Sequence, residues 1–268
     1  MSWFEHDTSR IYYEEQGSGE AVLLLPGFGD RIEAHLALRT ALVETGCRVI
    51  AADLPGSGRS EPIPRQYPAT FYEDDARSFA ALLDRLSATP AHLMGWSTGG
   101  EIALVMAAQT PAIARSVMTW GAAGQLNDPG GQVVETMNNI VDHPIPPLEE
   151  YSKYLIATYG AENARAMVRG QGIAITEIMK TRDGDLSLSQ AGHITCPVLL
   201  ITGEHDFFAP AENVAQLAAR LPNAQAITVE GAGHDVHNAR PEWFVQTVVN
   251  WLQAERSHSP AQTASARA

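Results

Sequence analysis

The sequence of 268 residues is poor in cysteine, in basic side chains and in long apolar runs. Its two cysteines, Cys47 and Cys196, form no Cys-x-x-Cys pair and no cysteine–histidine spacing typical of zinc ligands, so we expect structural thiols and no metal site. No stretch approaches the roughly 20 consecutive apolar residues that a membrane helix requires. The sequence therefore predicts neither a disulfide framework nor a membrane span.

Acidic side chains outnumber basic ones, with 31 Asp and Glu against 18 Lys and Arg and a formal net charge of −13. Surfaces that bind nucleic acid or anionic membranes are rich in Lys and Arg, so neither partner is expected. The first residues, Met1-Ser2-Trp3-Phe4-Glu5-His6-Asp7, lack a basic segment followed by an apolar core, and we expect no secretory signal and a cytoplasmic location. The expected partner is a small-molecule substrate, and nothing in the sequence indicates an oligomeric state.

Short apolar segments alternate with helix-forming segments along most of the chain. Such alternation predicts an α/β fold, in which a mostly parallel central sheet is covered by helices on both faces. Ligands of these sheets bind beyond the carboxyl ends of the strands. We expect strands at 11–15, 22–25, 48–52, 92–94, 116–120, 198–202 and 225–229, and helices at 33–44, 71–86 and 100–109.

The alternation stops between residues 124 and 193, where turn signals separate helical stretches at 132–140, 148–159 and 162–180. We interpret this segment as a helical cap inserted into a single domain and placed over the substrate pocket. The predicted organisation is a core at 1–123 and 194–254, a cap at 124–193, and a disordered tail at 255–268 that is rich in Ser, Ala and Gln.

The most informative motif is Gly95-Trp96-Ser97-Thr98-Gly99, which lies between an apolar strand and a helical stretch. A serine in this setting is held on a sharp turn that exposes its hydroxyl, and the small flanking residues allow the crowded backbone. A serine hydroxyl needs a general base, and the base needs an acid that orients it. The motif alone is also compatible with a glycine-rich turn that opens a helix.

Candidates for the base and the acid follow in the order serine, acid, histidine. Asp206 comes directly after the aliphatic strand at 198–202, and His234 comes after a glycine-rich loop that follows the next strand. Glu204 and Asp128 are alternative acids. The sequence favours Asp206 as the acid and His234 as the base, and a structural role for His237.

Five motifs in the correct order resemble those of the α/β-hydrolase family, from about Tyr12 to Leu252. They are Leu23-Leu24-Leu25-Pro26-Gly27-Phe28-Gly29, Asp53-Leu54-Pro55-Gly56-Ser57-Gly58-Arg59-Ser60, the Ser97 turn, the Asp206 loop and Gly231-Ala232-Gly233-His234. The Ser97 turn together with Thr119-Trp120-Gly121-Ala122 is similar to valacyclovir-hydrolase-like and lactonase-like serine esterases. Thr98 stands where relatives that take amino-acid esters have an acid, which argues against cationic α-amino esters.

The resemblance implies a serine hydrolase that cleaves a small to medium, largely apolar ester, lactone or thioester through an acyl-enzyme, with no cofactor. It implies Ser97, Asp206 and His234 as the catalytic triad and the backbone N–H groups of Phe28 and Thr98 as the oxyanion hole. Aromatic and aliphatic residues near the serine or in the cap are candidates for contacting substrate, although helical spacing favours simple packing for any one of the cap residues: Trp96, Trp120, Met137, Tyr151, Tyr154, Tyr159, Met167, Ile175 and Met179.

Two other functions stay open at this point. The same triad serves acyltransferases and hydrolases of carbon–carbon bonds, which differ in the acceptor or in the bond that breaks. The same fold also serves as a non-catalytic ligand-binding protein, in which a degraded triad is expected.

Overall fold

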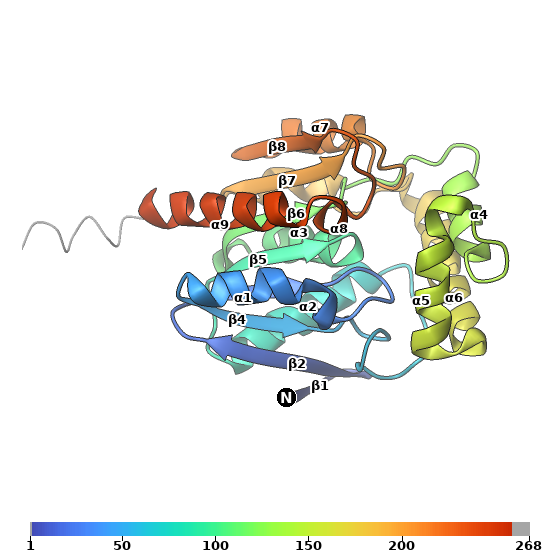
Figure 1. The fold of residues 1–268 in the computed structure, drawn as a ribbon, viewed down its shortest axis with the longest axis horizontal. Helices are drawn as coiled ribbons and strands as arrows, with labels where there is room; N and C mark the ends of the chain where they lie inside the picture. The colour runs from blue at the N-terminus through green and yellow to red at the C-terminus, as the bar shows by residue number, and fades with distance from the viewer. Residues whose placement is uncertain (1, 259–268) are drawn as a thin grey trace, which may run out of the picture.

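The computed structural model describes residues 2–258, in which an eight-stranded sheet has the order β1-β2-β4-β3-β5-β6-β7-β8 (Figure 1). Strand β2 pairs antiparallel with both of its neighbours, β1 and β4. The other adjacent strands, in the order β4, β3, β5, β6, β7 and β8, pair in parallel. The carboxyl ends of these parallel strands therefore all lie at the same end of the sheet. The strands are β1 (Ser2–His6), β2 (Ser9–Gly17), β3 (Glu20–Leu25), β4 (Cys47–Ala52), β5 (Ala91–Trp96), β6 (Ala114–Trp120), β7 (Val198–Gly203) and β8 (Ala224–Val229).

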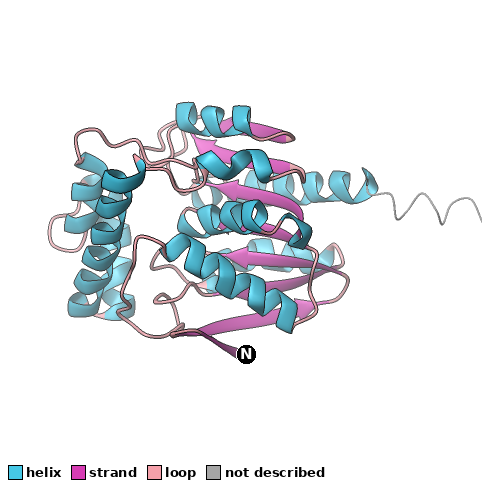
Figure 2. Ribbon diagram, turned by 180° about the vertical axis from the view of Figure 1, so that it is seen from behind, coloured by secondary structure: helices cyan, strands magenta, loops and turns pink. Residues whose placement is uncertain are grey.

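Helices cover both faces of the sheet, which confirms the predicted fold class (Figures 1 and 2). Successive strand residues point to opposite faces, so Leu23 and Leu25 pack in the core cluster that contains α2 and α3, whereas Val22 and Leu24 pack in the cluster that contains α1 and α9. The helices of the two faces are α1 (Leu36–Glu44), α8 (Val236–Ala239) and α9 (Pro241–His258) on one, and α2 (Phe71–Arg85), α3 (Thr98–Gln109) and α7 (Ala211–Arg220) on the other.

The first strand was not expected from the sequence. Its five residues alternate between half-buried and exposed positions and pair with β2, which extends beyond the predicted 11–15 at both ends. Neither strand shows a clear apolar run, because each buries only part of its surface at the edge of the sheet. Short 3-10 helices complete the described chain: η1 (Ile32–His35), η2 (Pro111–Ile113), η3 (Pro146–Leu148) and η4 (Leu188–His193).

The segment predicted as a cap contains α4 (Gln132–Asn139), α5 (Glu149–Tyr159) and α6 (Ala161–Arg182), which lie together beyond the carboxyl ends of the strands (Figure 1). These helices share a small apolar cluster that includes Ile140, Leu155 and Met167. The chain enters and leaves this segment side by side, because the amide of Leu126 donates to the carbonyl of Gly184 at 2.9 Å.

A buried carboxylate holds both ends of the cap segment. Glu101 on α3 accepts hydrogen bonds from the amides of Ala123 and Gly124, at 2.9 and 2.8 Å, and from the hydroxyl of Ser187 at 2.8 Å. Burial raises the pKa of Glu101 although these three donors lower it. Glu101 is thus a structural link between the core and the cap segment.

The expected disorder from residue 255 onward is wrong at its start, because α9 continues to His258. Arg256 pairs with Glu20 at 2.7 Å and donates to the carbonyl of Thr45 at 2.9 Å, so tertiary contacts extend the helix beyond its apolar residues. The remainder of the predicted tail, residues 259–268, lies outside the described residues.

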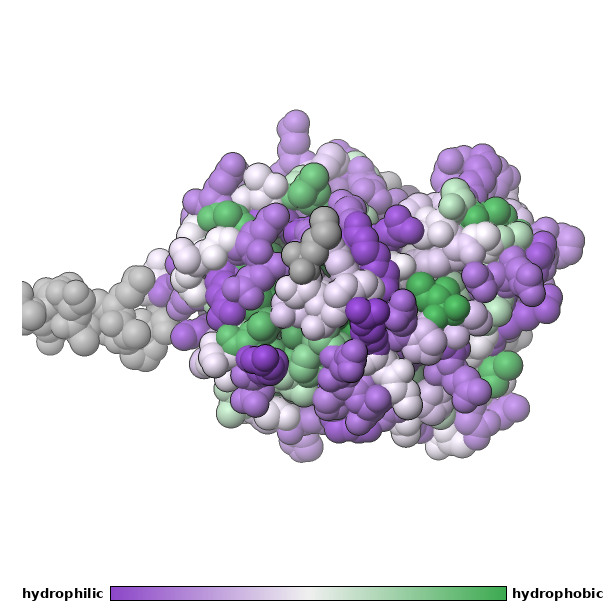
Figure 3. Space-filling view, turned by 90° about the horizontal axis from the view of Figure 1, so that it is seen from below, coloured by the Kyte–Doolittle hydropathy of each residue, from purple (hydrophilic) through white to green (hydrophobic). Residues whose placement is uncertain are grey.

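Hydrophilic side chains cover most of the face that Figure 3 shows and interrupt its hydrophobic areas. Among residues 2–258, no helix combines the length and the apolar character needed to cross a bilayer. Large apolar side chains that are exposed, such as Ile173 on α6 and Leu36 on α1, belong to different elements.

Candidate active site

Ser97 lies on a strained turn between β5 and α3. Its backbone has a φ of +51°, a conformation that is rare for residues other than glycine, and its amide donates to the carbonyl of Trp120 at 2.9 Å. The turn is so tight that a Cβ added at Gly95 would lie 2.3 Å from the carbonyl oxygen of Gly99. The glycines of the motif are therefore required by the close approach of the backbone, and the turn leaves the serine facing a cavity.

His234 lies in the loop between β8 and α8, with its imidazole directed at the serine. Its Nε2 is 3.0 Å from Ser97 Oγ, and its carbonyl accepts a hydrogen bond from the indole of Trp96 at 3.1 Å. Gly121 at the end of β6 leaves room for this ring, because a Cβ there would lie 2.8 Å from His234 Cε1. Small and aromatic neighbours thus fix where the imidazole can lie.

Asp206 contacts the other nitrogen of the same imidazole. Its two carboxylate oxygens lie 3.0 and 2.9 Å from His234 Nδ1, and its Oδ1 also accepts from the amides of Phe208 and Ala209. Burial alone would raise the pKa of this carboxyl group, but the imidazole and the two amides outweigh burial and hold the pKa below its ordinary value. Asp206 is therefore an ionised hydrogen-bond acceptor that fixes the orientation of the ring.

The alternative acids, Glu204 and Asp128, and the neighbouring histidine, His237, contact other groups. Glu204 accepts a hydrogen bond from the amide of Gly231, and the carboxylate of Asp128 accepts from the amides of Val133 and Val134 at the start of α4. His237 is buried and receives a hydrogen bond from the indole of Trp120 at 3.1 Å. Of the candidate acids, the structure brings only Asp206 to His234.

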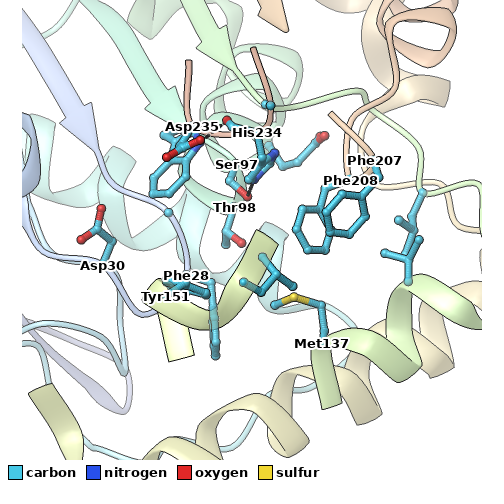
Figure 4. A pocket seen from close by; sticks show the side chains of 18 of the residues that line it. Phe28, Asp30, Ser97, Thr98, Met137, Tyr151, Phe207, Phe208, His234 and Asp235 are labelled. Atoms are coloured by element: carbon cyan, nitrogen blue, oxygen red, sulfur yellow. Dashed lines mark hydrogen bonds between the residues drawn. The ribbon is translucent and has the colours of Figure 1, made fainter. Parts of the chain in front are cut away.

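Phe28 and Thr98 line the same cavity as Ser97, and Thr98 follows the serine directly in the chain (Figure 4). Thr98 is the first residue of α3, and the first amide of a helix has no acceptor within the helix. Within the described residues, the amide of Phe28 also has no hydrogen-bond acceptor. Two free N–H groups in the cavity of the serine, one of them at a helix N-terminus, are suited to an oxyanion.

The loop that carries Phe28 is attached to the cap. The ring of Phe28 belongs to the apolar cluster of the cap helices, and its carbonyl accepts a hydrogen bond from the hydroxyl of Tyr151 on α5. The hydroxyl of Tyr159 donates to the carbonyl of Gly29 at 2.7 Å. On the core side, Asp53 accepts hydrogen bonds from the amides of Ile32 and Arg59, so its carboxylate ties together the two loops that follow β3 and β4.

A cavity of about 650 Å³ surrounds Ser97 and His234. Five of the nine predicted contact residues line it, namely Trp96, Met137, Tyr151, Tyr154 and Ile175. Four others do not, and each is engaged in packing or in a structural hydrogen bond: Trp120, Tyr159, Met167 and Met179.

Simple geometry explains why Trp120 and Met179 do not line the cavity. Trp120 alternates with Thr119 along β6, and this alternation turns its ring toward the layer of α1 and α9, where it packs against Phe244. Met179 lies one turn beyond Ile175, about 6 Å further along α6, and its Sδ packs against the turn at Gly184. The type of side chain therefore suggested which residues could line the cavity. The direction in which each strand or helix points its side chains decides which of them do.

Several residues that line the cavity were not expected from the sequence. Phe207 and Phe208 follow directly after Asp206, and the ring of Phe208 lies 4.9 Å from that of His234. Asp30 follows the Phe28 loop, and Gln171 on α6 donates to the hydroxyl of Thr98 at 3.4 Å. Their nearness to the motifs was a usable signal for the first three, whereas nothing in the sequence marked Gln171.

Residues 2–258 contain no group of three or more His, Cys, Asp or Glu side chains placed to hold a metal ion. The chemistry that the arrangement allows is that of its own groups. A hydroxyl is hydrogen-bonded to an imidazole and the imidazole to a buried carboxylate, and two residues with free amides line the same cavity. Such groups can form and break an acyl bond to the hydroxyl.

Comparison with known proteins gives a consistent result. The model of the family described as alpha/beta hydrolase fold matches residues 20–241. The human protein named serine hydrolase BPHL is 27% identical over an alignment that covers 91% of this chain and 83% of the relative. A thermophilic esterase from Thermogutta terrifontis superposes with a TM-score of 0.70 at 23% identity, covering 92% and 94% of the two chains. Est816, described as an N-acyl homoserine lactone degrading enzyme, superposes with a TM-score of 0.75 at 20% identity, covering 92% and 98%.

Proposed function

The chain belongs to the α/β-hydrolase fold family, and from this premise we propose that it is a serine hydrolase acting on carboxylic esters, lactones or thioesters. The single observation that carries the proposal is the continuous hydrogen-bond chain from Ser97 through His234 to Asp206. The lining of the cavity is largely apolar, which supports a small to medium substrate with an apolar part.

In the acylation step, Ser97 Oγ attacks the acyl carbon while His234 Nε2 takes the hydroxyl proton. Asp206 stabilises the imidazolium ion that forms and keeps Nδ1 directed at its carboxylate. The carbonyl oxygen becomes negatively charged and accepts hydrogen bonds from the amides of Phe28 and Thr98. The tetrahedral intermediate then collapses, and His234 gives its proton to the departing alcohol or thiol, which leaves the acyl group on Ser97.

In the deacylation step, water takes the place of the departed group. His234 removes a proton from the water as the water attacks the acyl carbon, and the same two amides stabilise the second oxyanion. Collapse of the intermediate returns the proton to Ser97 Oγ and releases the carboxylic acid. The sum is one ester and one water converted to one acid and one alcohol, with no cofactor.

The test is labelling with a fluorophosphonate, followed by intact-protein and peptide mass spectrometry. We expect one phosphonyl group on Ser97 in the wild type, none in Ser97→Ala, and greatly slowed labelling in His234→Ala. Circular dichroism of each variant establishes that it is folded. A folded wild type that stays unlabelled would contradict the proposal and would favour a ligand-binding protein of the same fold.

Acyl transfer and cleavage of a carbon–carbon bond remain alternatives that use the same groups. Product analysis separates them, because transfer gives a new ester when an alcohol or thiol is added, whereas hydrolysis gives the free acid. Carbon–carbon hydrolysis would be seen as turnover of a diketone without turnover of esters.

A further inference from the structure

The cavity around Ser97 has two chemically different arms (Figure 4). On one side of the serine lie Met137, Phe207 and Phe208, which we call the apolar arm. On the other side lie the carboxylates of Asp30 and Asp235, which we call the acidic arm. A substrate whose carbonyl is at Ser97 therefore extends one substituent toward each arm.

The apolar arm is formed by large uncharged side chains. The rings of Phe207 and Phe208 lie 4.0 Å apart, and Phe208 also lies against the ring of His234. Met137 faces this pair from α4 of the cap and is flexible enough to fit substituents of different shape. This side of the cavity suits an aryl or alkyl group.

The acidic arm combines a buried and an exposed carboxylate from two different loops. Asp30 follows β3 and is only 6% exposed, whereas Asp235 precedes α8 and is exposed to solvent. Asp30 Oδ1 accepts hydrogen bonds from the amide of Arg31 at 2.8 Å and from the hydroxyl of Tyr154 at 3.0 Å. These two donors account for Oδ1 and leave Oδ2 without a hydrogen bond among the described residues.

No lysine or arginine forms an ion pair with Asp30 among the described residues. Burial holds the pKa of Asp30 above its ordinary value and outweighs the charge of Arg31, which lowers this pKa. Nε2 of His35 lies 3.9 Å from Asp30 Oδ2, and burial lowers the pKa of His35 well below its ordinary value, so its ring is neutral at neutral pH. Among the described residues that line the cavity, none is lysine or arginine. Neither Asp30 nor Asp235 forms an ion pair with a lysine or arginine of the described chain.

The two other carboxylates of the cavity are already satisfied. Glu101 accepts three hydrogen bonds from the ends of the cap segment, and Glu150 pairs with Lys153 at 2.6 Å. Among the described residues of the cavity lining, the carboxylates without a lysine or arginine partner or a full set of donors are therefore Asp30 and Asp235, on one side of the serine. A buried carboxylate with a free oxygen attracts a cation or a hydrogen-bond donor and repels a second carboxylate.

We infer that the protein selects substrates by charge, accepting esters with an apolar group on one side of the carbonyl and a cationic or neutral polar group on the other. A carboxylate in the acidic arm would face Asp30 with no lysine or arginine in the described lining to pair with it, so substrates with an anionic group there are rejected. This inference rests on the proposed esterase function and adds the substrate class.

The test compares three esters of phenylpropanoic acid that differ only in charge. They are the choline ester, its uncharged carbon isostere with a tert-butyl group in place of the trimethylammonium group, and an ester of a hydroxy acid of similar length that carries a free carboxylate. A mirror set places the same three groups on the acyl side of phenylpropyl esters, so that the arm used by the acyl group need not be assumed. We expect kcat/KM to fall in the order cationic, neutral, anionic in at least one set, with about tenfold between neighbours.

The variant Asp30→Asn keeps an oxygen for Tyr154 but removes the charge. We expect it to reduce the cationic-to-neutral ratio of kcat/KM about tenfold and to raise the anionic-to-neutral ratio, whereas a merely structural role of Asp30 would change all three esters alike. Asp235→Asn should shift both ratios in the same direction by a smaller factor, because solvent screens its exposed carboxylate. Glu212→Gln, which removes an exposed charge on α7 outside the cavity, serves as the control for net charge and should leave both ratios unchanged.

The outcomes separate this inference from the proposed function. If the neutral esters are turned over and kcat/KM is the same for the cationic, neutral and anionic esters in both sets, the inference is overturned and the esterase function stays intact. Ratios that Asp30→Asn does not change would also overturn it. Failure of every ester in both sets, together with no fluorophosphonate label on Ser97, would instead contradict the proposed function.

Discussion

The hydroxyl of Tyr151, on cap helix α5, donates a hydrogen bond to the main-chain carbonyl of Phe28, whose own amide is proposed to stabilise the oxyanion. The Phe28 ring is also buried among residues of the cap. The cap thus holds the peptide group that joins Phe28 to Gly29, which follows directly after the peptide group that carries the Phe28 N–H. The position of the cap and the orientation of the proposed oxyanion donor are therefore coupled through the backbone of Phe28.

From this coupling we expect Tyr151→Phe to lower kcat about tenfold, because loss of the hydrogen bond frees the Phe28–Gly29 peptide group and lets the backbone of Phe28 shift its N–H, which then stabilises the transition state less well. KM for a small ester should change less than kcat. Tyr154→Phe is the matched control, since Tyr154 lies on the same helix but donates to the side chain of Asp30. A change in KM with kcat unaltered would show that Tyr151 only binds substrate.

Gly121→Ala should lower kcat about 100-fold, because the added Cβ would lie 2.8 Å from His234 Cε1 and would displace the imidazole from Ser97. The backbone at Gly121 has a φ of +68°, so the substitution also costs roughly 1 kcal/mol of stability. Gly46→Ala has the same kind of strain, with a φ of +78°, but nothing lies within 4 Å of its added Cβ. Steady-state kinetics and melting temperatures of the two variants separate strain from displacement, and equal losses of activity would contradict the role given to Gly121.

The stability that Asp206 contributes should disappear in acid. The folded-state pKa of Asp206 lies below its ordinary value of 3.8, so the folded protein binds fewer protons at this site than the unfolded chain does. Its contribution is complete above pH 3.8 and is lost as the pH falls through the lower folded-state pKa. Melting temperatures of wild type and Asp206→Asn should therefore differ most near neutral pH and converge below pH 3.8. A difference that stays constant over this range would mean that Asp206 is not ionised in the folded state.

Two methionines of the cap segment should behave differently when shortened. Met137 lines the cavity and Met179 does not, so Met137→Ala should raise kcat/KM for bulky substrates relative to small ones by about tenfold, whereas Met179→Ala should leave this preference unchanged. A series of esters of increasing size on either side of the carbonyl measures the preference. An equal shift in both variants would show that the cavity reaches further along α6 than the structure indicates.

Much of the fold could be predicted because its signals are local. Aliphatic strands such as 198–202 are buried on both faces and appear as continuous apolar runs, and the observed β7 extends this one by a single residue. The edge strand β1 was missed because its half-exposed residues produce no such run. The end of α9 was misjudged because contacts of Arg256 with distant residues stabilise its last turns.

The sequence by itself determined which groups can react, because a serine on a strand-to-helix turn, a carboxylate and a histidine at later strand ends are marked by their immediate neighbours. Only the tertiary structure decided how they meet and what surrounds them. Asp206 rather than Glu204 reaches His234, Trp120 turns away from the cavity, and Asp30 brings a buried carboxylate to one side of Ser97. The physical reason is that strand alternation and helix direction orient side chains in space, and these orientations depend on the packing of segments that lie far apart in the chain.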